Sequence, residues 1–447
     1  MNKKFKLQIL GAGPAGLAIA YFSKKNKISF TVYEKDSQVG GNCKTIIDGE
    51  FRYDTGAHRF HDKNKSVTEL IKKLMGDDIK AINAPSEIYY KSKMIQFPLH
   101  IGDIVKNLKY QIIIKIIFEN FINIFLPIKN FKNLKELSYS RYGKTLANMF
   151  LINYSEKLWG EDASQLLPET TGGRLKGLNL LFFLKNSMFK NIKKTQNLDG
   201  IFYYPKYGFG TIFESMELAI KSDNIELKSP ITKIVHNSKI LKSMIINEEK
   251  VNIHDKLVST LPLNVFINML EPPPPENIQN KVSSLKFRHI RLAILYLNIK
   301  NFSRNASIYF PEEQFSFTRI YEPKIRSTDM APSDKTCIVI EVPCSIKSNI
   351  YNNSDEDFKH QIISEVLLTK MIKEKDIIKS SAMKMPYAYP VIEKNNLESM
   401  SEIFSYIDAF ENLEYIGRGA DFKYNHINDI IKEASNKVEN MIVNYSN

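Results

Sequence analysis

A glycine-rich turn between two short apolar runs constrains the fold of this chain more than any other feature. Residues 6–10 (KLQIL) open onto Gly11-Ala12-Gly13-Pro14-Ala15-Gly16, and a second β-like run, residues 28–33, ends at Glu34. This order predicts a strand, a turn, a helix and a second strand in a βαβ unit. In such a unit Gly11 allows the tight turn, Gly13 lets backbone approach a pyrophosphate, and Gly16 lets the helix lie close to the strand.

Glu34 indicates that this unit binds a dinucleotide. It stands about twenty residues beyond the turn, where an acidic side chain accepts a hydrogen bond from a ribose 2′-OH. The alternative is a purely structural βαβ unit, but the strand, the helix and the acid are all present. Gly40-Gly41 suit a backbone that passes close to an extended, tightly held cofactor, which favours FAD over NAD.

The length and the cysteines limit the class of protein. A chain of 447 residues exceeds a single core, so we expect two or three substructures, and a hydrophobic share of 43% can fill them. The three cysteines, Cys43, Cys337 and Cys344, have no C-x-x-C spacing and cannot all be paired. A reducing cytoplasm is therefore expected. The chain goes directly into its first strand, so we expect no signal peptide.

The net charge of +13 comes mostly from lysine, because only ten of the 62 basic residues are arginines. Nucleic-acid binding requires basic residues clustered with aromatic ones on one face, and the sequence has no such patch. An anionic small substrate or a membrane surface fits the charge. Each arginine stands out, because arginine is the better bidentate ligand for phosphate.

Residues 101–128 are long, apolar and periodic, but charged residues interrupt them. Lys106, Lys109, Lys115 and Glu119 argue against a transmembrane segment, which needs about twenty mostly uncharged residues. We expect an amphipathic helix packed on the protein. Peripheral contact with a membrane surface is the alternative.

Further candidate residues lie in short motifs. Residues 49–61 predict a strand and a turn that lets the backbone pass under a flat ring. The alternative for His58 and His61 is that each is simply packed or hydrogen-bonded within the protein. We expect no metal site here. The only tryptophan, Trp159, lies in YSEKLWG, and Arg174 follows a double glycine, with a solvated surface arginine as its alternative. Alternation in residues 316–321 predicts that Phe317, Arg319 and Tyr321 share a face that suits a bound nucleotide.

The later part of the chain predicts a second sheet and a return to the first one. Pro272–Pro275 is a rigid candidate boundary, and residues 287–299, 307–310, 316–321 and 336–342 read as strands beyond it. Residues 413–419 predict a strand that ends on glycine, followed by a helix to about residue 443. This unit can return to the first sheet and present a second helix N-terminus to the cofactor.

Several motifs together resemble the UDP-galactopyranose mutase group within the flavin-containing amine oxidase and protoporphyrinogen oxidase superfamily. They are Gly11–Gly16, Gly40–Gly41, Asp54–His58, Tyr154–Gly160, Gly173–Arg174, Tyr204–Gly210, Tyr387–Pro390 and Gly417–Tyr424. The resemblance implies an α/β protein: a Rossmann-like FAD-binding domain (1–98, 199–271 and 399–447) with an inserted helical domain (99–198) and an antiparallel β-sheet substrate domain (272–398).

The resemblance also implies roles for individual residues. The expected FAD ligands are Gly11, Gly13, Ala15, Gly16, Glu34, Lys35, Gly41, Asn42, His58, Gly417, Arg418 and Asn428. The expected substrate-side residues are Trp159, Arg174, Arg319, Tyr321, Tyr389 and Tyr424, with Arg174, Arg319 and His58 as the catalytic set. The family usually has an aspartate where Asn428 stands, which leaves the surroundings of flavin O2 open.

The family's reaction interconverts pyranose and furanose forms of a UDP-galactose-like sugar through an adduct at N5 of reduced flavin, for cell-surface polysaccharide synthesis. Fixed cations would stabilise the leaving diphosphate. NAD(P)H is a candidate reductant, and a homo-oligomer is left open. One alternative is a flavin oxidase or desaturase, like the amine and protoporphyrinogen oxidases, that acts on an apolar or amine substrate. Another is a flavin-fold binding partner without turnover. Two cations at the site would distinguish the mutase from the oxidase, because an oxidase for neutral substrates has no need of them.

Overall fold

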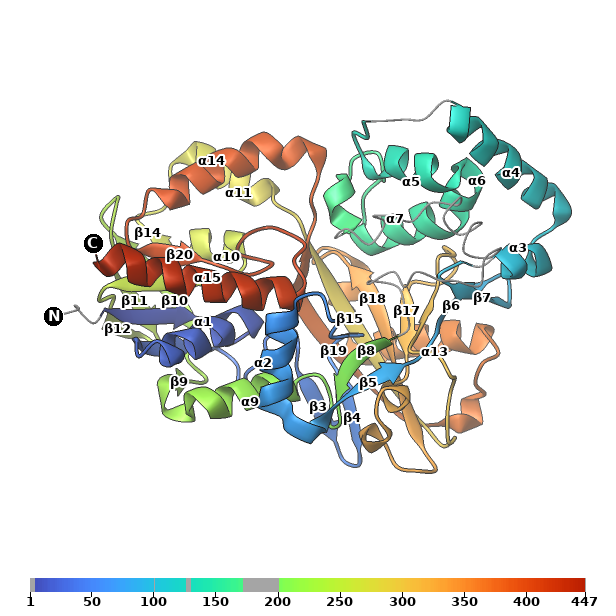
Figure 1. Ribbon diagram of the computed structural model, residues 1–447, viewed down its shortest axis with the longest axis horizontal. Coiled ribbons are helices and arrows are strands. Elements are labelled where there is room, and N and C mark those ends of the chain that lie inside the picture. The colour runs from blue at the N-terminus through green and yellow to red at the C-terminus, as the bar shows by residue number, and fades with distance from the viewer. Residues whose placement is uncertain (1–4, 100, 126–129, 172–200, 447) are drawn as a thin grey trace.

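The predicted βαβ unit forms the centre of a parallel sheet in the computed structural model, which describes residues 5–99, 101–125, 130–171 and 201–446 (Figure 1). The strand order is β20-β13-β1-β2-β9, and every pair is parallel. Helix α1 connects β1 to β2. The carboxyl ends of all five strands therefore meet at one edge, where sheets of this kind bind ligands. The bounds are β1 (Lys6–Leu10), α1 (Pro14–Lys25), β2 (Ser29–Tyr33), β9 (Ile225–Glu226), β13 (Lys256–Ser259) and β20 (Leu413–Tyr415).

Both faces of this sheet are covered by other elements. Leu7, Ile9 and Val32 pack against α1, α2 (Lys65–Met75), α9 (Thr211–Ile220) and α15 (Ile427–Ser446). Leu10 and Leu257 face the opposite layer, a sheet of order β12-β11-β10-β14 with three helices. That layer contains β10 (Ile231–His236), β11 (Leu241–Ile246), β12 (Glu249–Asn252), β14 (Leu270–Glu271), α10 (Leu263–Asn268), α11 (Glu276–Ser284) and α14 (Leu397–Asp408).

A seven-stranded sheet of order β19-β15-β18-β17-β16-β6-β7 forms the second half of the molecule. One face packs on α13 (Asp355–Leu368), and the other packs on the pair β3 (Thr45–Asp48) and β4 (Phe51–Asp54). Its strands are β6 (Ser86–Tyr90), β7 (Lys93–Phe97), β15 (Phe287–Leu297), β16 (Ser307–Tyr309), β17 (Arg319–Tyr321), β18 (Thr336–Cys344) and β19 (Ile377–Pro390). The short helix α12 (Asn349–Asn352) precedes α13, and β5 (Ile79–Asn83) pairs with β8 (Ile201–Pro205).

Residues 86–98 contain two β-like runs around the polar tip Lys91-Ser92, which predict a hairpin. The hairpin is present as β6 and β7, and it joins this second sheet. β6 pairs with β16 in parallel, whereas the other pairs of the sheet are antiparallel. The sheet is therefore mixed, and it combines strands from segments 1–98 and 272–398. The division of the chain at the four predicted boundaries stays a prediction.

The helices of residues 101–159 gather beside the seven-stranded sheet, at the upper right of Figure 1. Their core includes Leu134, Leu146 and Trp159. The bounds are α3 (Ile101–Asn107), α4 (Tyr110–Phe125), α5 (Leu134–Tyr142), α6 (Lys144–Leu146), a π-helical turn (Ala147–Ile152) and α7 (Asn153–Trp159). Helix α7 contacts β18 and so reaches the sheet.

The expectation of one amphipathic helix over residues 101–128, packed on the protein, is wrong in one respect, because the segment forms two helices, α3 and α4. Helix α4 packs on the protein through Ile116 and through Asn120 and Asn123, which hydrogen-bond to α5. Its other side is open to solvent, where Ile114 and Phe118 are 62% and 63% exposed. Within the part of the chain that the structure describes, no helix is both long and apolar enough to cross a bilayer.

Candidate functional site

The amino-terminal end of α1 lies at the carboxyl edge of the parallel sheet. Gly13 occupies its N-cap position without a side-chain cap, and Pro14 begins the helix. By contrast, α2, α5 and α13 are capped by the side chains of Asn64, Asn133 and Ser354. The first N–H groups of a helix have no intrahelical partner and carry partial positive charge. This end of α1 therefore suits a pyrophosphate.

Close backbone contacts shape the turn in front of α1. A Cβ on Gly16 would lie 1.9 Å from the carbonyl oxygen of Gly11, so only glycine lets the helix pack this closely. Gly41 has a φ of +53°, and a Cβ there would lie 3.1 Å from the Cα of Gly13. A Cβ on Gly13 itself would meet only the Cα of Gly41 within 4 Å, at 3.8 Å. Space beside Gly13 is therefore open to a ligand.

Glu34 fixes the same turn from the end of β2. Its Oε2 accepts a hydrogen bond from the Ala12 N–H at 2.7 Å, and its Oε1 accepts one from the Asp36 N–H at 3.0 Å. Each carboxylate oxygen has a second lone pair, so the carboxylate can also accept a hydrogen bond from a ribose hydroxyl. Lys35 is exposed. The structure brings Gly11, Gly13, Gly16, Glu34 and Gly41 together, as the arrangement for a dinucleotide requires.

His58 lies close to this turn and is uncharged. Its Nε2 is 3.0 Å from the carbonyl oxygen of Asn42. A carbonyl only accepts, so Nε2 carries the proton and Nδ1 is the acceptor of a neutral ring. Burial lowers the pKa of His58 to about 3, and the nearby cations Arg418, Arg319 and Arg326 act in the same direction. Three positive side chains therefore surround a neutral imidazole.

Arg418 connects the end of α1 to His58. A Cβ on Gly417 would lie 3.1 Å from the Cβ of Ala15, so the turn after β20 packs on the first turn of α1. Arg418 donates from Nε and Nη2 to the carbonyl oxygen of Asn425, at 3.2 and 2.9 Å. These bonds hold its guanidinium where its charge acts on His58.

Asn428 is buried at the beginning of α15. Its Nδ2 donates to the carbonyl oxygen of His61 at 2.7 Å and so ties the helix to the segment that carries His58. The predicted role of Asn428 toward a flavin stays a prediction.

Arg319 enters the site from β17. Both its Nε, at 2.8 Å, and its Nη2 donate to Oε2 of Glu341 on β18. The Arg319 side chain is 15% exposed, and Tyr154, Tyr309 and Tyr389 are close enough to act on its charge. A buried cation is thus oriented by one carboxylate and bordered by tyrosines.

Aromatic rings from three distant segments meet between Arg418 and Arg319. The Trp159 ring lies 5.7 Å from both the Tyr389 and the Tyr424 rings. The Arg418 guanidinium lies over the same two tyrosine rings, at 5.2 and 4.9 Å from their centres. The predicted substrate-side residues Trp159, Tyr389 and Tyr424 therefore form one cluster with Arg418.

Two predicted residues do not join this cluster in the structure. Tyr321 is 1% exposed, and its hydroxyl donates to the carbonyl oxygen of Asp54 at 2.6 Å, so the expectation that it contacts substrate is corrected. Phe317 does not share the face of Arg319 and Tyr321, because β17 begins only at Arg319 and Phe317 packs in a different core. Arg174 lies outside the described residues.

Two acidic residues that support the site were not predicted. Glu341 stands as the one charge in an otherwise apolar strand, TCIVIEVPC, and that anomaly was the available signal. Asp54 is fully buried and accepts hydrogen bonds from the Tyr204 hydroxyl, the Thr45 hydroxyl and the Phe209 N–H, at 2.5, 2.7 and 2.8 Å. It joins the turn of His58 to the turn that contains Gly208 and Gly210. Only tertiary structure reveals that link.

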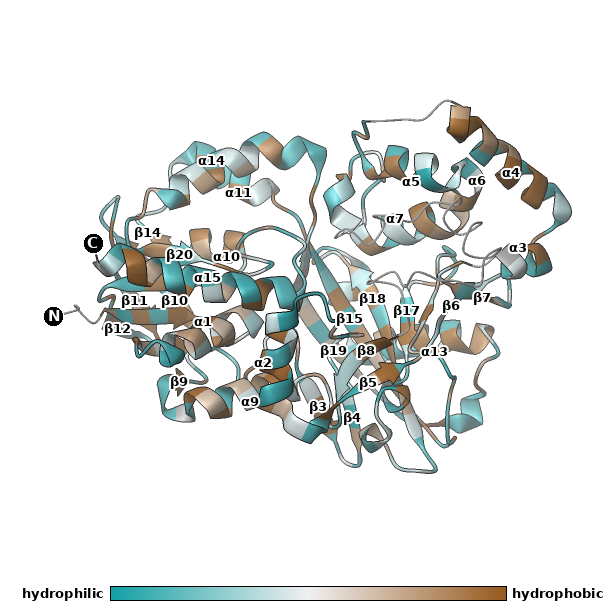
Figure 2. Cartoon of the chain, in the orientation of Figure 1, coloured by the Kyte–Doolittle hydropathy of each residue, from teal (hydrophilic) through white to brown (hydrophobic). Residues whose placement is uncertain are grey.

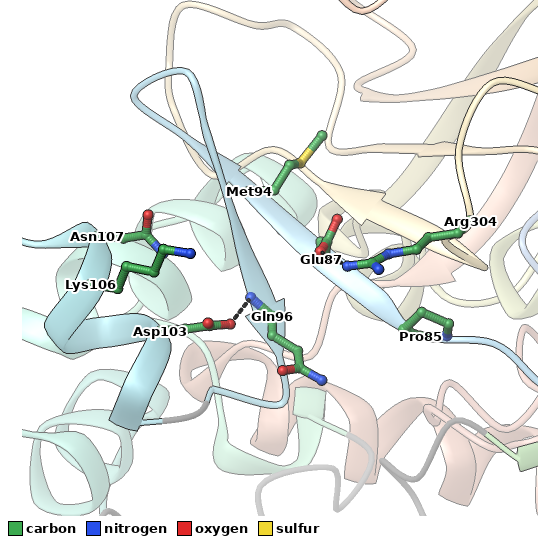
Figure 3. A pocket seen from close by; sticks show the side chains of 8 residues that line it. All are labelled: Pro85, Glu87, Met94, Gln96, Asp103, Lys106, Asn107 and Arg304. Carbon is green, nitrogen blue, oxygen red and sulfur yellow. Dashed lines mark hydrogen bonds and ion pairs between the residues drawn. The ribbon is translucent and has the colours of Figure 1, made fainter.

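A hollow of about 270 Å³ lies away from these residues, between the β6–β7 hairpin, α3 and Arg304 (Figure 3). Its acids already have partners: Glu87 accepts from the Asn305 amide at 2.6 Å, and Asp103 accepts from the Gln96 N–H at 3.0 Å. It offers no set of groups for catalysis.

Two family models match the chain. The NAD(P)-binding Rossmann-like domain matches residues 9–74, and UDP-galactopyranose mutase matches residues 149–378, just over half of the chain. Among curated proteins, the protoporphyrinogen oxidase of Dictyostelium discoideum is 24% identical over 327 residues, 60% of this chain and 62% of that protein. The UDP-galactopyranose mutase of Mycoplasma pneumoniae is 33% identical over 72 residues, 15% of this chain and 18% of that protein. The chain thus spans less than two thirds of either relative.

Solved structures resemble the whole chain. A structure of reduced UDP-galactopyranose mutase has a TM-score of 0.83 at 17% identity and covers 98% of this chain and 95% of its own. A putative protoporphyrinogen oxidase from Exiguobacterium sp. 255-15 has a TM-score of 0.75 at 14% identity, covering 99% and 100%. These likenesses confirm the predicted Rossmann-like fold. Since the mutase model covers more than half of the residues, the chain belongs to the UDP-galactopyranose mutase family.

Proposed function

We propose that the protein is an FAD-dependent mutase that interconverts the pyranose and furanose forms of a UDP-galactose-like nucleotide sugar, in the synthesis of cell-surface polysaccharide. One observation carries the proposal: Arg319 and the cluster of Trp159, Tyr389 and Tyr424 lie beside the Arg418–His58 end of the dinucleotide turn. Family membership supports the same reaction.

The residues present fit FAD. The uncapped end of α1 would receive the pyrophosphate, and Glu34 would accept a hydrogen bond from the ribose. Arg418, His58, Asn42 and the residues around Asn428 would face the flavin half. The reduced flavin would supply the nucleophile for the anomeric carbon, and NAD(P)H is the proposed source of its electrons.

The protein side chains would act on the leaving diphosphate. Negative charge grows on this group as the bond between C1 and oxygen breaks, and a fixed cation in a buried site stabilises that charge more than water does. Arg319 is such a cation, because Glu341 already fixes its geometry. Tyr389 and Tyr424 would donate hydrogen bonds to the phosphates, and Trp159 would pack against the substrate. Arg174, from outside the described residues, is the proposed second cation.

A flavin oxidoreductase is the second candidate. The Dictyostelium protoporphyrinogen oxidase matches 60% of the chain and favours it. The Arg319 cation argues against an amine substrate, because a neutral or cationic group would gain nothing from a desolvated guanidinium.

The deciding experiment adds UDP-galactopyranose to purified, FAD-loaded protein under dithionite without oxygen and separates the products by chromatography. We expect the furanose form from the wild type and a large loss with Arg319→Lys, which retains the charge but not the fork. Absence of furanose, together with oxygen uptake on an amine or a porphyrinogen, would replace the proposal with the second candidate.

A further inference from the structure

Helix α4 is held in place by polar side chains that point toward the protein. Asn120 and Asn123 donate from Nδ2 to the carbonyl oxygens of Tyr142 and Tyr139, at 2.8 and 2.7 Å. Both carbonyls belong to the C-terminal part of α5, and that of Tyr139 also accepts a hydrogen bond from the N–H of the C-cap residue Gly143, at 2.9 Å. Glu119 accepts hydrogen bonds from the N–H and hydroxyl of Thr145 in α6, at 2.6 and 2.7 Å. The rotation of α4 about its axis is therefore fixed.

This rotation leaves a wide apolar surface of α4 exposed. We name six of its exposed apolar side chains the α4 face: Tyr110, Ile114, Ile117, Phe118, Phe121 and Phe125, which are 56–71% exposed. Their spacing of three, four and seven residues places them on one side of the helix. Figure 2 shows α4 as a strongly hydrophobic helix at the outer edge of the molecule. A contiguous exposed patch of this kind marks an interaction surface.

The charges beside the α4 face are positive. Lys106, Lys109 and Lys115 are exposed on or beside α3 and α4. The two acids of these helices are less exposed than the lysines, and they accept hydrogen bonds, Asp103 from the backbone of Gln96 and Glu119 from Thr145. The chain as a whole carries a formal charge of +13. The occupant of this surface therefore has to combine an apolar layer with negative charge.

An anionic lipid surface meets both requirements, whereas a second copy of the chain meets only one. A two-fold interface pairs each patch with itself, so the lysines of one copy would meet those of the other. The described residues of α3 and α4 offer no fully exposed acid to pair with them. Helix α4 has 16 residues, or roughly 24 Å at about 1.5 Å per residue, which is short of a hydrocarbon core of about 30 Å. It can lie in a membrane surface but not span it.

We propose that the α4 face seats the protein on an anionic membrane surface, with α4 lying in the interfacial plane and the three lysines at the level of the lipid headgroups. The inference concerns a surface apart from the nucleotide turn. It does not depend on which reaction the site performs.

The test is co-sedimentation of the FAD-loaded protein with vesicles of phosphatidylcholine, with and without phosphatidylglycerol. We expect binding only to the anionic vesicles, weakened by salt. Phe118→Ser with Phe121→Ser should lower the partition coefficient by roughly tenfold or more, because each phenylalanine loses its burial in lipid. Replacing Lys106, Lys109 and Lys115 by Gln should also lower it by roughly tenfold or more.

Matched controls change the same residue types elsewhere. Leu218→Ser with Leu368→Ser removes two other exposed apolar side chains, 79% and 67% exposed, and Lys25, Lys73 and Lys80 to Gln removes three other exposed lysines. Both controls should leave partitioning nearly unchanged. No binding to anionic vesicles, or an equal loss in the controls, overturns the proposal. It is also overturned if the wild type does not bind vesicles and instead sediments as a dimer, and if Phe118→Ser with Phe121→Ser dissociates that dimer.

Discussion

The carboxylate of Glu341 holds Arg319 with one oxygen and the backbone of Ala57 with the other. Oε2 accepts from Arg319, and Oε1 accepts from the Ala57 N–H at 2.8 Å. Ala57 directly precedes His58, so one buried acid positions both the cation on β17 and the turn that carries the imidazole. The two sides of the site are thus mechanically connected through β18.

Glu341→Gln should destabilise the protein strongly. The Arg319 charge would stay buried without its counter-charge, and breaking a buried pair in this way costs about 3–5 kcal/mol. Chemical denaturation measures the loss. Glu161→Gln is the matched control, because Glu161 pairs with Lys286 at the surface and should cost about 1 kcal/mol or less. Equal stability of the two variants would contradict the structural role given to Glu341.

Gly13→Ala should fold but lose FAD. A methyl group at Gly13 meets only Gly41, at 3.8 Å, an ordinary contact, yet it occupies the space beside the uncapped end of α1. We expect flavin absorbance per protein to fall at least tenfold, while circular dichroism stays that of the wild type. Gly102→Ala, at a glycine with open space around it, is the control and should keep its flavin. Full flavin content in Gly13→Ala would mean that the pyrophosphate does not bind at this turn.

His58 should remain uncharged well below neutral pH. Burial and three nearby cations lower its pKa to about 3, below the value of about 6.5 in an unfolded chain. Acid therefore protonates the unfolded state first, and this histidine's contribution to stability is lost as the pH falls from about 6.5 toward 3. Histidine-labelled NMR spectra, assigned with His58→Asn, should show the His58 ring unchanged between about pH 8 and 5. The exposed His254 provides the comparison signal. A His58 midpoint near 6.5 would contradict the burial and the cations described.

Local patterns predicted the elements that local residues determine. The strand, glycine turn and helix at the start depend on Gly11, Gly13 and Gly16, which lie within six residues, and the β6–β7 hairpin depends on the polar tip Lys91-Ser92. The family resemblance, and not a local pattern, predicted that Trp159, Tyr389 and Tyr424 share one site. No pattern within one segment places three rings that are up to 265 residues apart in the chain side by side.

The sequence could not show which residues of distant elements contact each other. Arg319 stood out, but its pairing with Glu341 depends on the register between β17 and β18. Residues 110–125 are apolar around much of the helix, so their periodicity alone does not show which residues pack inward. That choice depends on α5, whose C-terminal carbonyls accept from Asn120 and Asn123. Hydrophobic patterning assumes that apolar residues are buried, and in α4 this holds for Ile116 but not for Ile114 or Phe118.

Asp421 should make the protein less stable as the pH rises from about 4 to 6. The residue is 5% exposed in the turn that follows β20, where its Oδ2 accepts from the Gly417 N–H at 2.9 Å. Burial raises its pKa to about 6, with the charge of Glu433 acting in the same direction. Because an unfolded aspartate titrates near 3.9, the unfolded state releases its proton first, at a cost to folding of up to about 3 kcal/mol above pH 6.

Asp421→Asn isolates this effect, since the amide oxygen can still accept from the Gly417 N–H and carries no charge. The free energy of unfolding of the variant should match that of the wild type near pH 4 and exceed it near pH 7, by about 1–3 kcal/mol. Urea denaturation at both pH values measures the difference, and Asp77→Asn, an exposed aspartate, should show no such growth. A variant that is less stable than the wild type at pH 7 would mean that the ionised carboxylate holds this turn together, because its hydrogen bond to Gly417 would then outweigh the cost of burying the charge.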